Sequence, residues 1–105
     1  MTAQDQAILA ALAAQVRRSF PTAEIRAFGS RARGTSQPDS DMDICVVLPK
    51  VSREATGLVR RAAWEIGFEN NRVVTTIILD VGQFTSGPLS ESGLVAAIRR
   101  DGVAG

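Results

Sequence analysis

The sequence of 105 residues contains no histidine and a single cysteine, Cys45. Without histidine the chain cannot form a Ser-His-Asp triad, and no imidazole can act as a general base. One cysteine cannot form a disulfide within the chain, and alone it supplies too few ligands for a usual zinc site. The sequence therefore excludes histidine-based catalysis and argues against a zinc centre.

The sequence also lacks an excess of charge of either sign and lacks long apolar runs. Twelve lysines and arginines face eleven acidic residues, for a net charge of +1. This balance argues against a general nucleic-acid clamp, which is normally basic overall or along one face. No run approaches the ~20 apolar residues of a membrane helix, and the N-terminus does not resemble a signal peptide. We therefore expect a cytoplasmic protein with no membrane partner.

Aromatic residues are scarce, at 5% of the chain, although 45% of the residues are hydrophobic. The core must therefore consist mostly of alanine, valine, isoleucine and leucine. A chain of this size and composition can bury enough surface for one real core. We find no internal repeat, low-complexity tract or linker. The sequence therefore predicts a single domain over residues 1–105.

Apolar periodicity and turn residues predict three helices and three strands. The helices are expected over residues 3–19, 52–66 and 90–100, and the strands over residues 24–28, 42–48 and 73–79. With a helical turn after residue 28, the order is αβαβαβα, which predicts an α/β sandwich with a small mixed sheet of at least three strands. In the last helix, the buried face is expected to consist of Leu94, Val95 and Ile98.

Two aspartates, Asp41 and Asp43, stand at the start of the strand predicted over 42–48. Successive strand residues point to opposite faces, so these two carboxylates are expected to project together, away from Met42. A divalent cation would remove their mutual repulsion, and Mg²⁺ prefers one or two carboxylates plus substrate phosphates. Asp41 and Asp43 are thus candidate metal ligands, although a solvated turn explains an isolated Asp-x-Asp more simply.

A second candidate feature is the pair Gly29-Ser30, which follows the strand predicted over 24–28. A glycine at the end of a strand lets the backbone approach a ligand closely. The serine can cap a following helical turn while its hydroxyl and nearby amides face an anion. For Gly-Ser alone, however, an ordinary strand-to-helix turn is the preferred interpretation.

Two familiar motifs fail on the same residues. Gly29 and Gly34 have the spacing of a Walker A loop, but Thr35 stands where its lysine belongs. The aspartates at every second position over 39–43 resemble the start of an EF-hand loop. The loop's turn glycine and closing glutamate are replaced by isoleucine and lysine, however, so neither motif explains the stretch.

The combination of the two features is more specific than either alone. Gly-Ser at 29–30, about ten residues, and then Asp-Met-Asp at 41–43 resemble the polymerase-β-type nucleotidyltransferase superfamily. The fuller string Gly-Ser-Arg-Ala-Arg-Gly, followed by Ser-Asp-Met-Asp-Ile, resembles its minimal nucleotidyltransferase branch. Those are small bacterial and archaeal proteins, often antitoxins paired with HEPN-domain toxins. The match is strongest over residues 24–48.

This resemblance implies a set of site residues. Gly29 and Ser30 would bind the triphosphate of ATP, and Asp41 and Asp43 would be catalytic residues that bind Mg²⁺. The physical argument agrees, because a two-metal site clamps the attacking and leaving oxygens of an in-line displacement.

Two arginines, Arg31 and Arg33, follow the Gly-Ser pair. They could neutralise phosphate charge as further nucleotide-binding residues. The alternative is a structural role, in which one or both pair with Asp39 or with a carbonyl group near the C-terminus.

The third strand departs from the family pattern, which usually places another carboxylate there. Residues 72–79 contain no acid, and Asp80 closes the strand. If the second and third strands are parallel, Asp80 lies roughly 20 Å too far along, at ~3.3 Å per residue. We therefore predict that Asp80 is not catalytic and that Thr75 or Thr76 occupies the position of the acid.

The resemblance implies transfer of AMP from ATP to a hydroxyl on a partner protein, in an antitoxin whose partner is a HEPN-like toxin. The chain is expected to have no room for a second domain that holds the acceptor. The alternative is a catalytically weak or inactive module that acts by binding its toxin or by forming a homo-oligomer. The sequence leaves open the acceptor, the nucleotide preference and the oligomeric state.

Overall fold

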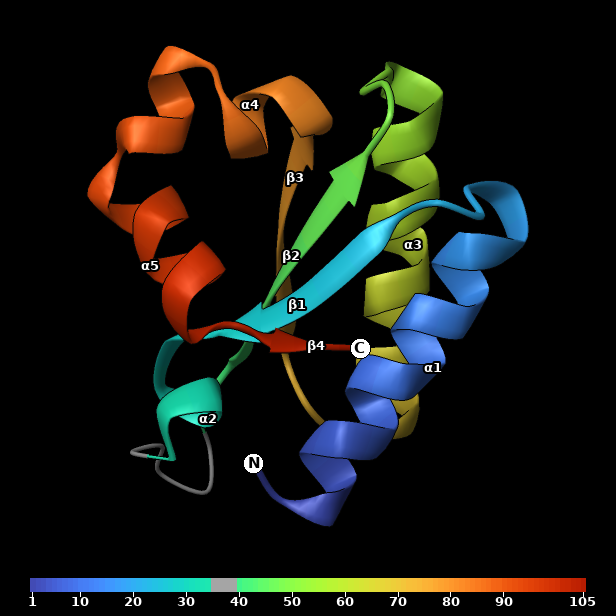
Figure 1. Ribbon diagram of the computed structural model, residues 1–105. Helices are drawn as coiled ribbons and strands as arrows, with labels where there is room; N and C mark the ends of the chain where they lie inside the picture. The colour runs from blue at the N-terminus through green and yellow to red at the C-terminus, as the bar shows by residue number, and fades with distance from the viewer. Residues whose placement is uncertain (35–39) are drawn as a thin grey trace.

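The computed structural model describes residues 1–34 and 40–105, which form a central sheet between two layers of helices (Figure 1). This arrangement confirms the predicted α/β sandwich, and the three predicted strands and three predicted helices are all present. In chain order the elements are α1 (Ala3–Ser19), β1 (Glu24–Phe28), α2 (Gly29–Arg33), β2 (Met42–Leu48), α3 (Arg53–Glu69), β3 (Val74–Asp80), α4 (Val81–Thr85), the 3₁₀ helix η1 (Pro88–Glu91), α5 (Gly93–Asp101) and β4 (Val103–Ala104).

The sheet is mixed, as predicted, and has the strand order β3-β2-β1-β4. β1 is antiparallel to both β2 and β4, whereas β2 and β3 are parallel. The parallel pair follows from the helical crossover through α3, because parallel neighbours need a long connection. The register aligns Phe28 with Asp43 and Asp43 with Thr75. The end of β1 and the starts of β2 and β3 therefore meet at one end of the sheet.

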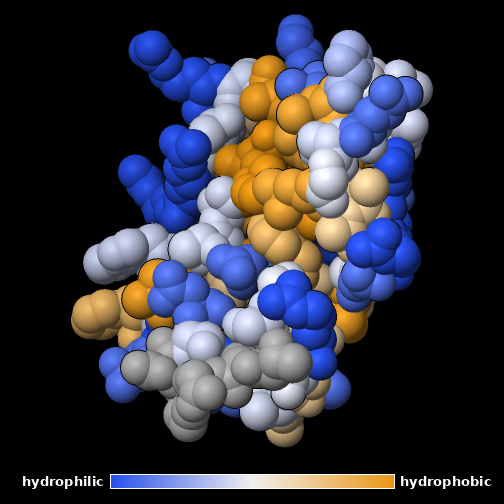
Figure 2. All heavy atoms as spheres, turned by 90° about the vertical axis from the view of Figure 1, so that its left-hand side faces the viewer, coloured by the Kyte–Doolittle hydropathy of each residue, from blue (hydrophilic) through white to orange (hydrophobic). Residues whose placement is uncertain are grey.

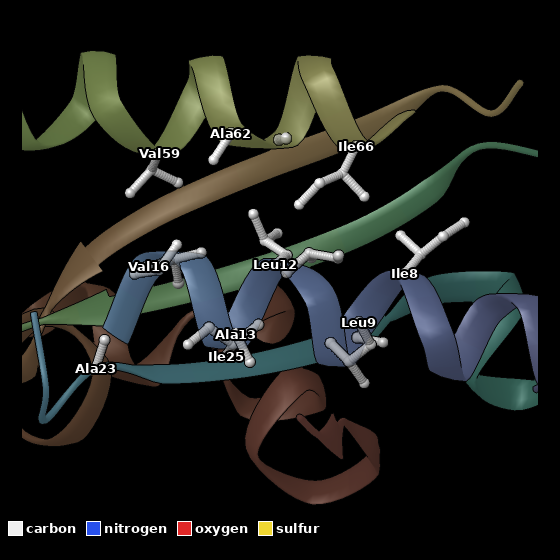
Figure 3. Close-up of a cluster of buried hydrophobic side chains, with 14 of the residues drawn as sticks. Ile8, Leu9, Leu12, Ala13, Val16, Ala23, Ile25, Val59, Ala62 and Ile66 are labelled. Atoms are coloured by element: carbon white, nitrogen blue, oxygen red, sulfur yellow. The ribbon is translucent and has the colours of Figure 1, made fainter. Parts of the chain in front are cut away.

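The larger part of the core lies between the sheet and the helices α1 and α3. From β2 it receives Met42, Ile44, Val46 and Leu48, all fully buried, as their alternation in the sequence predicts. Figure 3 shows helical side chains of this layer, with those of α3 directed toward α1. They include Ile8, Leu9, Leu12, Ala13 and Val16 from α1, and Val59, Ala62 and Ile66 from α3.

The opposite face of the sheet is covered by α4 and α5. Cys45 and Val47 of β2 pack there against Phe84 of α4 and against Val95 and Ile98 of α5. Because β2 is buried on both faces, its sequence is a nearly continuous apolar run. Burial raises the pKa of the Cys45 thiol to about 11, so this cysteine stays protonated and acts as a small core residue.

The structure corrects the prediction for Leu94, which is 49% exposed instead of buried. Leu94 and Val95 flank the same helical stripe, and the sheet covers only the side of Val95. β4 and α4 were also not predicted, since two residues show no periodicity and five show little. No helix among residues 1–34 and 40–105 combines the length and the apolar character needed to cross a lipid bilayer.

Asp5 is a buried acidic residue, with only 1% of its surface exposed, and it contacts three segments that are distant in the sequence. It forms a capping box with Thr2 at the start of α1, a pattern that satisfies two helix N–H groups. Its Oδ1 accepts a hydrogen bond of 2.6 Å from Arg72, just before β3, and lies 3.7 Å from Nη1 of Arg31 in α2. Burial alone would raise the pKa of Asp5, but the Arg72 and Thr2 hydrogen bonds and the arginine charges outweigh it and lower the pKa.

We predict that Asp5→Asn lowers the free energy of unfolding by about 3–5 kcal/mol, because it leaves buried arginine charge without its counter-ion. Urea unfolding followed by circular dichroism measures this loss. Asp101→Asn is the matched control, because Asp101 pairs with Arg100 at an exposed site. Such surface pairs contribute only about 0–1 kcal/mol. Equal losses in the two variants would contradict a structural role for Asp5.

The same carboxylate predicts the acid sensitivity of the fold. Because the pKa of Asp5 is lowered in the folded state, its stabilisation is present above the unfolded pKa of about 3.9. That stabilisation is lost as the pH falls through the folded pKa. The unfolding temperature of the unmodified protein should therefore fall more steeply below pH ~4 than that of Asp5→Asn. Parallel pH profiles for the two proteins would contradict this assignment.

Candidate functional site

The predicted site residues gather at the end of the sheet where β1 ends and where β2 and β3 begin. The antiparallel register sets Phe28, the last residue of β1, opposite Asp43 near the start of β2. Gly29 follows immediately, so the Gly-Ser pair is brought against the aspartate, as the resemblance implied. The pairing of β1 with β2 thus brings Gly29 and Asp43 together although they are distant in the sequence, and this pairing does not depend on any ligand.

Gly29 makes the closest approach in the site. Its φ of +75° lies in the left-handed region, and a Cβ added there would lie 2.5 Å from Oδ2 of Asp43. The positive φ favours glycine, and a Cβ at this position would push the Asp43 carboxylate aside. The prediction that Ser30 caps a helical turn is wrong, because Ser30 lies inside α2 and the N-cap residue is Phe28, which makes no side-chain cap hydrogen bond. Ser30 itself is half-buried beside Gly29.

Asp41 and Asp43 flank a fully buried residue, Met42, whose side chain belongs to the core on the α1–α3 side. Asp41 is exposed and Asp43 is half-buried. The alternation of strand residues directs the Asp43 carboxylate away from that core. Asp41 lies just before β2, so its projection together with Asp43 stays a prediction. Two such carboxylates suit Mg²⁺, which completes its shell with phosphate oxygens and water.

Within the described part of the chain, no group of three or more histidine, cysteine, aspartate or glutamate residues could hold a metal ion. Asp41 and Asp43 are thus two carboxylates without a third candidate ligand of these types among the described residues. This composition fits Mg²⁺, which dehydrates reluctantly and is usually held by one or two carboxylates together with substrate phosphates.

The position next to Asp43 on β3 is occupied by Thr75. The Thr75 hydroxyl donates a hydrogen bond to Oδ1 of Asp43. Of the two threonines expected near the site, Thr75 is therefore the one that contacts Asp43, and Thr76 points to the other face. That Thr75 replaces an acid of the family stays a prediction. Asp80 pairs with Leu48 at the opposite end of β3, as predicted, and its carboxylate caps α4.

Of the two roles that the sequence left open for Arg31, the structure supports the structural one. Arg31 is only 4% exposed, and its Nε and Nη2 donate to the carbonyl oxygen of Ser40 at 3.3 and 3.1 Å. Its third nitrogen faces Asp5. Arg33 is exposed on α2, so its part in nucleotide binding stays a prediction. Asp39, the other proposed partner of the arginines, lies outside the described residues.

A small hollow of about 170 Å³ lies between α2 and α5, lined in part by Gly29, Arg33 and Leu94. It is smaller than the ~300 Å³ at which sites for whole small molecules begin, so it cannot hold a complete nucleotide. Figure 2, which faces this side of the molecule, shows hydrophobic residues gathered down its middle with hydrophilic residues around them. The exposed large hydrophobic residues of α4, η1 and α5 are Val81, Leu89 and Leu94.

Sequence reasoning missed two contacts that shape the site. One is the contact of Asp5 with Arg72, and the other is the hydrogen bond from Thr75 to Asp43. The only local signal for Asp5 was its spacing from Thr2, which is that of a capping box. Its contact with Arg72 spans 67 positions, and the contact of Thr75 with Asp43 spans 32. Neither contact has a local pattern in the sequence.

Solved structures support the same fold. A protein of Sulfolobus solfataricus assigned to the nucleotidyltransferases is 24% identical, with a TM-score of 0.53. That likeness covers 96% of this chain and 81% of the other. A crystal structure of a toxin–antitoxin with AMP-PNP contains a chain that is 21% identical, with a TM-score of 0.56 and coverage of 89% and 68%. At these identities the likeness concerns the fold alone.

No curated protein matches the chain. The family model of the nucleotidyltransferase domain, in contrast, matches residues 9–96, which include every site residue predicted from the sequence. The match agrees with the resemblance carried by the Gly-Ser and Asp-x-Asp pairs and with the mixed sheet that brings them together. The chain therefore belongs to the nucleotidyltransferase domain family, of the polymerase-β type.

Proposed function

We propose that this chain is a minimal, magnesium-dependent nucleotidyltransferase that moves AMP from ATP to a hydroxyl group on a partner protein. In this proposal it is the antitoxin of a pair whose toxin is HEPN-like. The observation that carries the proposal is the approach of Gly29 to the Asp43 carboxylate, with Asp41 two residues away. A carboxylate pair beside a glycine turn is an arrangement that can hold a cation and a phosphate chain together.

Each site residue has a distinct part in binding. The backbone of Gly29 and Ser30 binds the triphosphate, because a residue without a side chain allows phosphate oxygens to approach the main chain. Asp41 and Asp43 hold Mg²⁺, which when bound neutralises phosphate charge and orients the triphosphate for in-line displacement. Arg33, exposed on α2, can add a positive charge toward the phosphates.

In the transfer step, the oxygen of the acceptor hydroxyl forms a bond to the α-phosphorus of ATP. The bond from that phosphorus to the bridging oxygen of the β-phosphate breaks, and pyrophosphate leaves with the electron pair. The hydroxyl proton passes to the Asp43 carboxylate or to water, since the chain has no histidine. The acceptor and ATP supply all the atoms of the products, so no other reactant is needed.

Three observations support a protein as the acceptor. The net charge of +1 gives no basic excess for grasping a nucleic acid. The face that carries α4 and α5 exposes Val81, Leu89 and Leu94, and exposed apolar residues that gather on one face favour contact with another protein. A structure with the same fold is a toxin–antitoxin with AMP-PNP.

The alternative is a catalytically weak module that neutralises its partner by binding. Thr75 favours this alternative, because a hydroxyl that donates to Asp43 cannot take up the acceptor's proton as a carboxylate could. Retention of both Asp41 and Asp43 favours the enzyme. We therefore expect slow turnover with intact nucleotide binding.

We predict that ATP binds in a magnesium-dependent manner. The double variant Asp41→Ala/Asp43→Ala should bind MgATP at least tenfold more weakly, about 1.4 kcal/mol, because it removes both carboxylate ligands. Isothermal titration calorimetry with and without EDTA measures the effect. Asp80→Asn is the control, since Asp80 lies at the far end of β3 and asparagine can also cap α4. Equal affinity in all of these samples would contradict the site.

Gly29 and Gly34 form a matched pair that isolates the contact with Asp43. Both have a φ of +75°, but an added Cβ meets Asp43 at Gly29, whereas at Gly34 it meets no atom of the described residues within 4 Å. Gly29→Ala and Gly34→Ala should therefore share a backbone strain of about 1–2 kcal/mol. Only Gly29→Ala should also weaken MgATP binding, because it displaces the carboxylate. Titration of both folded variants tests this, and equal affinities would contradict the proposed role of Gly29.

The transferase itself is tested by incubating the chain, ATP and Mg²⁺ with a small helical HEPN-like protein encoded beside it. Intact-mass spectrometry should show that the partner gains the mass of one AMP. The gain should vanish with Asp41→Ala/Asp43→Ala and persist with Asp80→Asn. A stable complex that neutralises the partner without any mass change, equally well with the double variant, would overturn the transferase and leave the binding module.

A further inference from the structure

The β3 strand is an edge that lacks the usual protection of an edge strand. In the described part of the chain, β3 pairs only with β2, and seven consecutive residue pairs form that ladder without a bulge. The strand contains no proline, and its only charged residue is Asp80 at its last position. Monomeric proteins normally protect such an edge with charges, prolines or bulges, because its free N–H and C=O groups pair readily with another strand.

Two aromatic residues of α3 stand beside this edge. Trp64 and Phe68 stack with ring centroids 5.3 Å apart, and they are 67% and 75% exposed. Val73, just before β3, is 60% exposed. The two rings contact each other, but the stacking leaves most of each ring exposed to water. Exposed apolar residues in such a cluster mark an interaction surface.

The strand and the aromatic pair belong to one surface. They line a hollow of about 850 Å³ whose walls include Arg60, Trp64 and Phe68 from α3 and Val74 and Thr76 from β3. Thr76 points to the α3 side of the sheet, whereas Thr75 points to the Asp43 side. The hollow therefore lies on the opposite face of the sheet from the nucleotidyltransferase site, and its occupant need not compete with ATP.

We propose that this surface, formed by β3 and the Trp64–Phe68 pair, binds a second copy of the chain in a symmetric dimer. A two-fold axis perpendicular to the sheet would pair β3 antiparallel with β3 of the second copy. The two sheets of four strands would then form one continuous sheet. The same axis sets the two α3 helices side by side and antiparallel, because both cover the same face of the joined sheet.

The symmetry fits the side chains that the helices present. Arg60 lies four residues before Trp64, and Phe68 lies four residues after it. In an antiparallel helix pair centred at Trp64, Arg60 of each copy lies opposite Phe68 of the other. A guanidinium over an aromatic ring is a favourable cation–π position. One surface thus supplies both the donor and the acceptor of its own contacts, as a two-fold interface requires.

The extent of the surface suits a modest dimer. An aromatic side chain buries about 150–250 Å², so Trp64 and Phe68 together leave roughly 250 Å² exposed in each copy. The edge of a seven-residue strand and the hollow beside it extend this area toward the ~800 Å² per partner of a standard interface. An isolated peptide strand could pair with β3, but it would carry no second α3 helix to cover the aromatic rings.

The oligomeric state is tested on the complete chain by sedimentation equilibrium over a range of concentrations. We expect a species of twice the 11.2 kDa chain mass that dissociates on dilution. Trp64 is the only tryptophan, so its fluorescence reports directly on this surface. Its emission should shift to longer wavelength as the dimer dissociates. A monomer at every concentration, with the emission of an exposed indole, would overturn the proposal.

Matched variants locate the interface. Trp64→Glu/Phe68→Glu should weaken dimerisation at least tenfold without a change in circular dichroism, because both side chains are already exposed. Val81→Glu is the control, since Val81 is 49% exposed on α4 and away from this surface. A dimer that persists unchanged in the double glutamate variant would overturn the proposal. MgATP binding should stay unchanged in both variants, so failure of the dimer is distinguishable from failure of the proposed function.

Discussion

The buried carboxylate of Asp5 is the constraint on which the geometry of the site depends. It fixes the start of α1, the approach to β3 and the side chain of Arg31 in α2 at a single point. A buried carboxylate is unfavourable unless arginines and N–H groups pair with it. These three segments therefore cannot separate without leaving a buried charge unpaired. Arg31 in turn holds the carbonyl group of Ser40, which precedes β2. The Arg31 hydrogen bonds thereby connect the turn after β1 to the segment just before β2.

The approach of Gly29 to Asp43 follows from that tie together with strand register. Pairing of β1 with β2 places the two residues side by side, and the Arg31 contacts orient the turn that leaves β1. Glycine is favoured here because φ is positive, and a Cβ would displace the carboxylate. Main-chain pairing and a buried charge therefore set the position of the Asp43 carboxylate beside Gly29, and no bound ligand is needed for this arrangement.

The sequence predicted the parts of this structure that rest on local rules. The alternation of apolar residues in β2, the turn after Phe28 and the carboxylates around Met42 all follow from neighbouring residues. Contacts across long sequence separations were not predictable, and these include Asp5 with Arg72 and Thr75 with Asp43. Parallel pairing of β2 with β3 was predicted from the crossover, and it correctly placed Asp80 at the distant end.

The same reasoning failed for α5, where Leu94 and Val95 both fit the helical stripe. A helical period shows which residues share a side of the helix, but it does not show how far the neighbouring layer reaches. The sheet covers Val95 and leaves Leu94 at the small hollow beside Gly29. The sequence did not predict which strand lies at the edge of the sheet, because strand order depends on which segments pair. β3 lies at an edge because β4 pairs with β1, at the other side of the sheet.

Thr75 separates the two tasks that the site would perform. Its hydroxyl donates to Asp43 without adding negative charge, so within residues 1–34 and 40–105 Asp41 and Asp43 form a pair of carboxylates and not a cluster of three. Fewer carboxylates repel one another less, and two are enough for Mg²⁺ when phosphates complete its shell. In the proposed function, nucleotide binding would therefore depend on Asp41 and Asp43, which this chain has. Removal of the acceptor's proton would lack a carboxylate beside Asp43, because Thr75 lies there and the carboxylate of β3, Asp80, is at the far end, so slow turnover is expected together with intact binding.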